Sequence, residues 1–179
     1  NPFLCNLMRH AERCNMPMIF HIGVQGGDYG IVDSLGLPGL EWALQHFPRL
    51  RFLGHSQKFW AHMSADVSEE SWTGYPGGKV IPGGRITYLL DKYENLSCDL
   101  SAGSGYNALS RDPEFAAHFI ETYQDRLFFG TDICSPNNAN DSRVLLSEFL
   151  DNLMQEGKIS YAAYEKVSRK NALALLSMN

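Results

Sequence analysis

The sequence predicts one α/β domain built on a parallel sheet, and three observations lead to this prediction. Four short apolar runs bounded by turn residues are typical of strands: 17–20, 51–54, 96–100 and 127–130. Apolar residues at helical spacing fill the segments between them. A polar residue stands at or just beyond the end of each run, namely His21, His55, Asp99 and Asp132. Strands that alternate with helices in this way indicate βαβ units and a parallel sheet.

Helices are predicted where apolar residues recur three or four positions apart. They hold the segments 3–11, 40–47, 86–93, 113–120, 144–153 and 161–176, the last as one or two helices. Asp112 is the predicted N-cap of the fourth helix and Pro113 its first residue, because Asp accepts a free backbone N–H and proline tolerates the first turn. The stretch 63–84 is polar and rich in Gly and Pro, so it predicts a long loop between a strand and its helix.

Composition and charge exclude several classes of protein. The length of 179 residues suits a single domain, 1–179, with a sizeable core. Fifteen Lys and Arg against twenty Asp and Glu give a net charge of -5, and no basic stripe is present, so nucleic acid is not an expected partner. No apolar run is long enough to span a membrane and no signal peptide pattern opens the sequence. We expect a cytoplasmic protein that does not bind membranes.

The four cysteines are scattered and contain no C-x-x-C pair, so they predict neither a disulfide framework nor a thiolate zinc site. We expect them to be reduced and mostly buried: Cys5, Cys14, Cys98 and Cys134. The sequence opens with Asn1 and Pro2 rather than Met and reads as a helix within a domain by residue 5. We therefore expect further residues to precede it.

Two architectures suit this pattern, an open doubly wound sheet and part of a (β/α)8 barrel. A complete barrel takes about 250 residues, so four predicted strands supply only part of one. In both architectures the carboxyl ends of the strands form the rim of the active site. His21, His55 and Asp132 are predicted there, and imidazole nitrogens with a carboxylate suit zinc or a similar divalent ion. Each alone is typical of a hydrogen-bonded buried group, but three at one relative position favour a site.

Three short segments contain the strand-end residues: Phe20-His21-Ile22-Gly23, Leu53-Gly54-His55 and Phe128-Phe129-Gly130-Thr131-Asp132. In this order and spacing they resemble strands five, six and eight of the amidohydrolase superfamily, in the branch of amidohydrolase family 2 that includes aminocarboxymuconate semialdehyde decarboxylase-like enzymes. Segment 96–102 resembles strand seven, and 171–176 resembles the closing helix. The resemblance implies a (β/α)8 barrel of the TIM type with one or two divalent metals, usually zinc, with manganese as the alternative.

The resemblance also implies roles for the strand-end residues. His21 would be a metal ligand, and His55 a second ligand or a group that polarises substrate or metal-bound water. Asp132 would bind the metal and act as general base, because a metal lowers the pKa of bound water to about 7 and a neighbouring carboxylate takes its proton. The family's His-x-His pair of strand one is absent from this sequence. We therefore expect a C-terminal half barrel that self-associates or pairs with a missing N-terminal half.

The expected substrate is a small carboxylate-bearing molecule, either hydrolysed or decarboxylated without oxidation. Candidate substrate-binding residues are Trp60, Tyr75, Lys79, Arg85, Ser101 and Tyr106. Lys79 and Arg85 are the candidates for a substrate carboxylate. Two alternatives stay open. Gly54-His55-Ser56 begins like the nucleophile elbow of a serine hydrolase but lacks its closing glycine. The chain could also be a half barrel without catalytic activity, which binds a ligand at the rim and serves as a binding or oligomerising module.

Overall fold

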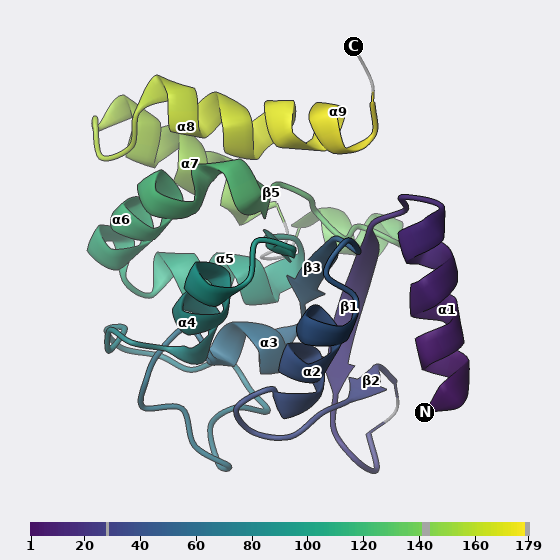
Figure 1. The fold of residues 1–179 in the computed structure, drawn as a ribbon. Helices are drawn as coiled ribbons and strands as arrows, with labels where there is room; N and C mark the ends of the chain where they lie inside the picture. Colours follow the sequence, from purple (N-terminus) through teal and green to yellow (C-terminus); the bar gives the residue numbers. More distant parts are fainter. Residues whose placement is uncertain (28, 141–143, 178–179) are drawn as a thin grey trace.

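Five short parallel strands form one sheet at the centre of the protein (Figure 1). The computed structural model describes residues 1–27, 29–140 and 144–177. The order across the sheet is β2-β1-β3-β4-β5. The strands are β1 (Met18–Gly23), β2 (Ile31–Val32), β3 (Phe52–His55), β4 (Leu96–Asp99) and β5 (Leu127–Phe128). Strands β1, β3, β4 and β5 therefore lie side by side in the order of the sequence.

The register of the sheet places the strand ends at one level. His21 of β1 is opposite His55 of β3. Gly54 of β3 is opposite Cys98 of β4, which brings Asp99 beside His55. Side chains at one level of a parallel sheet point to the same face. The fold thus gathers polar residues that are more than thirty positions apart in the sequence.

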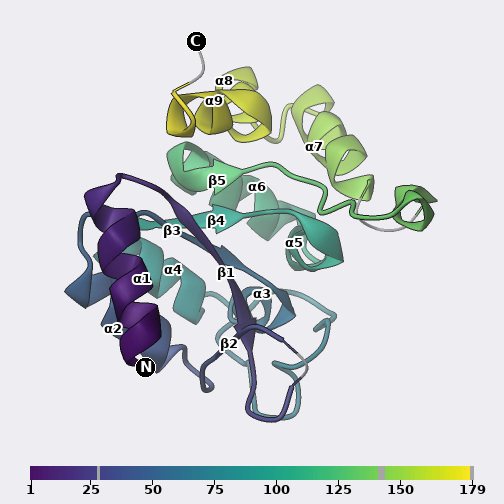
Figure 2. The ribbon, with the colours of Figure 1, turned by 90° about the vertical axis from the view of Figure 1, so that its right-hand side faces the viewer.

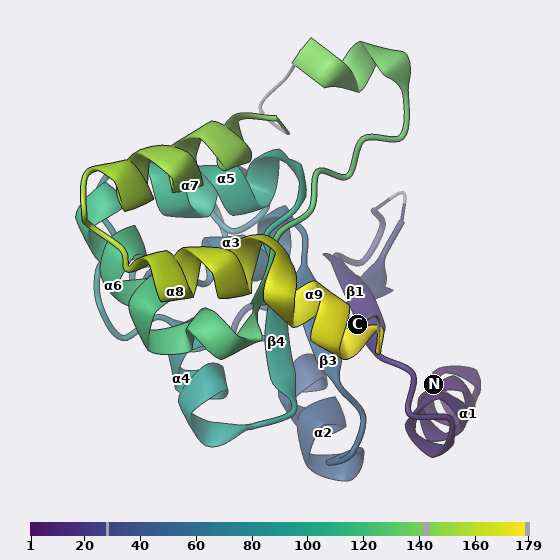
Figure 3. The same cartoon turned by 90° about the horizontal axis from the view of Figure 1, so that it is seen from above.

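Helices surround this sheet on its sides and at one end (Figures 1 and 2). They are α1 (Pro2–Arg13), α2 (Pro38–His46), α3 (Gln57–Ala61), α4 (Arg85–Lys92), α5 (Ala102–Ser110), α6 (Pro113–Tyr123), α7 (Leu145–Gln155), α8 (Tyr161–Glu165) and α9 (Asn171–Leu175). A π-helical turn, Lys166–Lys170, joins α8 to α9, so the two run in one line (Figure 3). Both run along the end of the sheet where the strands begin (Figure 1). The side chain of Asn171 anchors α9 there by donating to the carbonyls of Gln124 (2.6 Å) and Leu127 (2.8 Å).

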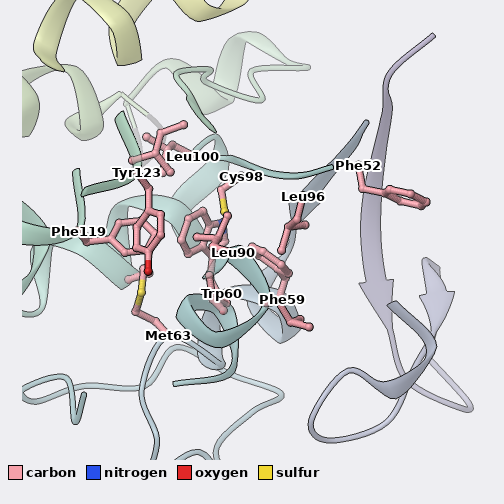
Figure 4. Close-up of a cluster of buried hydrophobic side chains, with 14 of the residues drawn as sticks. Phe52, Phe59, Trp60, Met63, Leu90, Leu96, Cys98, Leu100, Phe119 and Tyr123 are labelled. Atoms are coloured by element: carbon pink, nitrogen blue, oxygen red, sulfur yellow. The ribbon is translucent and has the colours of Figure 1, made fainter. Parts of the chain in front are cut away.

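Leucines and large aromatic side chains form much of the core between the helices and the sheet (Figure 4). Trp60 and Phe59 of α3 pack there with rings at 5.3 Å and a near-perpendicular angle of 82°, a favoured aromatic geometry. Gly54 of β3 has no side chain because Phe59 needs the space: a Cβ at Gly54 would lie 2.2 Å from the Phe59 ring. The core therefore depends on this glycine.

The other face of the sheet is only partly covered. Along β1, Phe20 and Ile22 are buried in the core, whereas Ile19 is 63% exposed. Parallel sheets are normally covered on both faces. One side of this sheet thus remains open to solvent near its β1 edge.

The structure confirms the α/β class, the parallel sheet and the four predicted strands. It also confirms that Asp112 caps α6, since its Oδ1 accepts the Phe115 N–H at 3.2 Å. Strand β2 and the helices α3 and α5 were not predicted. The (β/α)8 barrel stays a prediction.

The prediction for the cysteines is wrong in part. All four are free, but Cys98 alone is buried, Cys5 is half-buried, and Cys14 and Cys134 are exposed. Burial raises the pKa of the Cys98 thiol, which keeps it protonated and inert. Within the described residues, none of the helices is long and apolar enough to cross a bilayer.

Candidate active site at the carboxyl end of the sheet

Two histidine rings lie side by side where β1 and β3 end. The ring centroids of His21 and His55 are 5.4 Å apart. On its other side the His21 ring meets the ring of Tyr29 at 4.6 Å. Gly30 allows this approach, because a Cβ there would lie 3.0 Å from Cδ2 of His21 and 2.8 Å from its carbonyl oxygen. His21 is thus held between Tyr29 and His55.

The surroundings of His21 favour its neutral form. Burial lowers the pKa of His21 most, and the neighbouring His55 and Lys58 lower it further. The carboxylate of Asp132 acts in the opposite direction and raises this pKa. A neutral imidazole is the form that binds a metal or accepts a proton. Asp132 therefore lies near enough to influence His21 electrostatically.

His55 is fixed by the end of the next strand. Its Nδ1 lies 2.8 Å from Oδ2 of Asp99. The hydroxyl of Ser101 donates to the same carboxylate oxygen at 2.6 Å. Asp99 and Ser101 are both buried, at 8% and 6% exposure. This cluster of three residues ties the carboxyl ends of β3 and β4 together.

A cavity of about 480 Å³ opens beside these residues. Its polar wall comes from the ends of β3, β4 and β5: His55, Asp99, Ser101, Thr131 and Asp132. Apolar side chains of the sheet and of α9 form the rest, namely Pro17, Ile19, Leu53, Phe128, Phe129, Ala172, Leu175 and Leu176. An apolar pocket of this size with a few convergent polar groups is the usual form of a small-molecule site.

The backbone is strained at the same strand ends. Ser56 follows β3 with φ 105°, Ala102 follows β4 with φ 64°, and Asp132 lies beyond β5 with φ 59°. Each has a side chain that disfavours positive φ, and such a conformation costs about 1–3 kcal/mol. Strained residues of this kind cluster at functional sites. Three of them on one edge of the sheet support the assignment of this edge as the site.

The predicted metal ligands have suitable chemistry but do not form a complete ligand set. Two imidazoles and a carboxylate are donor types that zinc accepts. Within residues 1–27, 29–140 and 144–177, however, no three His, Cys, Asp or Glu side chains converge as ligands of one ion. Nδ1 of His55 is already hydrogen-bonded to Asp99, so Nε2 is the ring nitrogen of His55 that remains available to coordinate a metal. The described residues therefore supply at most part of a metal site, and the three-ligand assignment stays a prediction.

Of the six predicted substrate-binding residues, Ser101 lines the cavity. Trp60 is 2% exposed and lies in the core, where its Nε1–H donates to the carbonyl of Asp99 at 3.1 Å. Arg85 is bound by Glu41 and donates to the Gly36 carbonyl at 2.7 Å. Neither Trp60 nor Arg85 reaches the cavity.

The other three candidates also lie elsewhere. Tyr75 is exposed and its hydroxyl accepts from Gln57 at 3.3 Å. Lys79 is exposed beside Glu114 at 3.9 Å. Tyr106 of α5 packs edge to face against Phe149, with centroids 6.2 Å apart. The structure does not bring these residues to the strand ends.

Ser56, the nucleophile of the serine hydrolase alternative, is buried at 1% exposure. Its hydroxyl donates to the Ile22 carbonyl at 3.0 Å and accepts the Phe59 N–H at 3.3 Å. These bonds cap α3 and attach it to β1. The side chain therefore has a structural role, and among the described residues it hydrogen-bonds to no general base.

Two residues of the site were not predicted to have a role, Asp99 and Thr131. Asp99 does stand at a strand end in the sequence, and that position was the available signal. Its contact with His55 depends on the register of β3 and β4, which the sequence does not encode in any local pattern.

These features define an α/β protein with imidazole, carboxylate and hydroxyl groups gathered at the carboxyl edge of a parallel sheet. The chain matches the sequence profile of the amidohydrolase family over residues 2–178 and belongs to that family. A comparison with curated proteins gave no match.

Proposed function

We propose that this chain carries part of the active site of an amidohydrolase-type enzyme that acts on a small carboxylate-bearing substrate. Membership of the family supports a metal-dependent hydrolase or decarboxylase role. The observation that carries the proposal is the pair His21 and His55, whose rings lie 5.4 Å apart at the strand ends. His55 borders a cavity that Asp132 also lines.

The chain's own residues can bind a substrate and move a proton. His55 and Asp132 border the cavity and are the proposed proton-transferring groups, as general acid or base. The apolar wall from Ile19, Leu53 and Phe128 would exclude water from a bound molecule. In hydrolysis such a base takes a proton from the attacking water. In decarboxylation the acid protonates the carbon that loses CO2.

Family members use divalent metals, usually zinc, which supply an activated water when bound. The described residues of this chain do not complete a ligand set. We propose that His21 offers one side of the metal site, with zinc the expected ion and manganese the alternative. Nε2 of His55 either adds a second ligand or serves the proton transfer.

The open face of the sheet supports a larger assembly. Strands β1, β3, β4 and β5 are neighbours in sequence order, and the two-residue strand β2 pairs with β1 on its other side. Ile19, on the face that carries the site, is 63% exposed. We propose that this is the C-terminal part of a (β/α)8 barrel, completed by a second polypeptide segment or by self-association. A binding or oligomerising module without catalysis is the alternative. A strictly monomeric chain at high concentration in sedimentation analysis would argue against an exposed half barrel.

The test is an activity assay on the 179-residue chain with added Zn²⁺ or Mn²⁺. Small carboxylic acids and their amides are the probes, with CO2 release and amide hydrolysis measured separately. His55→Gln and Asp132→Asn should each abolish turnover, whereas His10→Ala, on the exposed surface of α1, should not change it. Turnover that survives in both site variants would contradict the proposal, and the product would separate hydrolysis from decarboxylation.

A further inference from the structure

Asp99 is fixed on all sides, although it occupies the wall of a cavity. Its Oδ2 accepts from the Ser101 hydroxyl at 2.6 Å, and its Oδ1 accepts from the Ser101 backbone N–H at 3.2 Å. Its backbone carbonyl accepts from Nε1–H of Trp60 at 3.1 Å. A carboxylate held in this way has one orientation, and it presents Oδ2 to Nδ1 of His55 at 2.8 Å.

We infer that Asp99 is a positioning residue, which holds His55 with its proton on Nδ1 and its lone pair on Nε2, available to the cavity. The inference rests on the proposed function, in which His55 exchanges a proton with the substrate. An ionised carboxylate can only accept hydrogen bonds, so the neutral imidazole beside it must carry its proton on Nδ1. The hydrogen bond also fixes the plane of the ring.

A second buried histidine shows what a purely structural imidazole looks like in this protein. Nδ1–H of His62 donates to the Lys58 carbonyl at 2.6 Å, and its Nε2 accepts the Gly36 N–H at 2.9 Å. Both of its nitrogens are occupied, and the residue is fully buried. His55 differs, because none of the described residues hydrogen-bonds to its Nε2 and because it borders the cavity. One nitrogen is held and the other is left available.

The packing around Asp99 leaves it little freedom to move. A Cβ at Gly130 of the neighbouring strand end would lie 3.0 Å from Cβ of Ser101 and 3.4 Å from Oδ1 of Asp99. The strained Ala102, with φ 64°, follows Ser101 directly. The structure thus holds Ser101 and Asp99 in place at the start of α5. Asp99 would therefore act by orienting the imidazole of His55.

The test reads the tautomer of His55 directly. Long-range ¹H–¹⁵N spectra of the metal-free chain at pH 9, above the ordinary pKa of imidazole, distinguish protonated from unprotonated ring nitrogens. His55→Gln assigns the signals. Wild type should show His55 protonated on Nδ1. In Asp99→Asn the amide oxygen is needed by the Ser101 N–H, so the NH2 group faces Nδ1 and the tautomer should invert. Glu94→Gln, at an exposed position, is the matched control and should change nothing.

Turnover gives the second measurement. Inversion of the tautomer should lower kcat by about 10²–10⁴ with little change in KM, because a misplaced proton on such an imidazole costs about 10⁴ in kcat in a well-studied case. Ser101→Ala leaves the carboxylate in place and should keep the Nδ1 proton.

The outcomes separate this inference from the proposed function. A wild-type tautomer with the proton on Nε2, or an unchanged tautomer in Asp99→Asn, would overturn the positioning role even if the chain is active. The predicted tautomers in a chain without any turnover would support the positioning and count against activity of this chain on its own. If Asp99→Asn does not fold, the wild-type and Ser101→Ala spectra decide, because both should show the Nδ1 proton.

Discussion

His21 and His55 stand opposite each other in the register of β1 and β3, with ring centroids 5.4 Å apart. The pairing follows from the parallel sheet, in which equivalent strand ends meet at one edge. Residues that are separated in the sequence become neighbours there.

The two imidazoles should give the chain a weak affinity for Zn²⁺. Two nearby nitrogen donors begin a zinc site without completing it. His21→Ala should lower the affinity at least about tenfold, since even outer groups of metal sites contribute about 10–100-fold. Isothermal titration of Zn²⁺ into the apo chain measures this. His10→Ala removes an exposed histidine of α1 and should leave the affinity unchanged; an equal loss in both variants would mean that binding is nonspecific.

Ser56→Ala should preserve activity and reduce stability. The hydroxyl caps α3 and donates to the Ile22 carbonyl, so its removal should cost about 1–2 kcal/mol. Chemical denaturation gives the stability, and the assay with added metal gives the activity. Complete loss of turnover in a folded Ser56→Ala protein, together with full activity in Asp132→Asn, would favour the serine hydrolase alternative.

Gly54→Ala should destabilise the core. The new Cβ would lie 2.2 Å from the Phe59 ring, which is fully buried and cannot move aside. Overpacking of this kind costs about 1–3 kcal/mol. Gly74→Ala is the matched control, because a Cβ there meets no atom within 4 Å. Equal midpoints of denaturation for the two variants would show that β3 and α3 are packed differently.

Glu41 should contribute stability that disappears in acid. The hydrogen bond from Lys92 is the main cause that lowers the pKa of Glu41 to about 2, with Tyr93 and Arg85 adding to it. Because the folded pKa lies below the ordinary value of 4.5, this stability is present above pH 4.5 and is lost as the pH falls towards 2.

The measurement compares the free energy of unfolding of wild type and Glu41→Gln across this range. At neutral pH the variant should be less stable by on the order of 1 kcal/mol, a value typical of a partly exposed ion pair. The difference should shrink between pH 4.5 and 2. A difference that stays constant with pH would mean that the hydrogen bonds of Glu41 do not depend on its charge.

The sequence predicted those parts of the fold that local signals encode. Asp112 and Pro113 marked the start of α6 because a cap and a first-turn proline are local features. Helix α5 was missed because its Gly and Ser residues have low helix propensity. Tertiary packing forms it instead: Gly105 lies so close to β4 that a Cβ would be 2.0 Å from the Leu100 carbonyl oxygen.

The sequence likewise predicted only those site residues that a local signal marks. His21, His55 and Asp132 were predicted from their place at strand ends. Trp60 was predicted as a substrate-binding residue because α3 was not predicted, and the structure buries it in the core. The bond between His55 and Asp99 joins residues on different strands, so it depends on the register and not on spacing. Local sequence patterns do not predict long-range contacts of this kind.

The most direct test of the central claim is to titrate His21 by NMR in three forms of the chain. If His21, His55 and Asp132 form one site, His55→Gln should raise the pKa of His21 by removing a neighbouring positive charge. Asp132→Asn should lower it by removing a neighbouring negative charge. The signals of His10, which is exposed on α1, serve as the control in the same spectra. Shifts of opposite sign are the predicted result, and a pKa of His21 that is the same in all three forms would contradict the site.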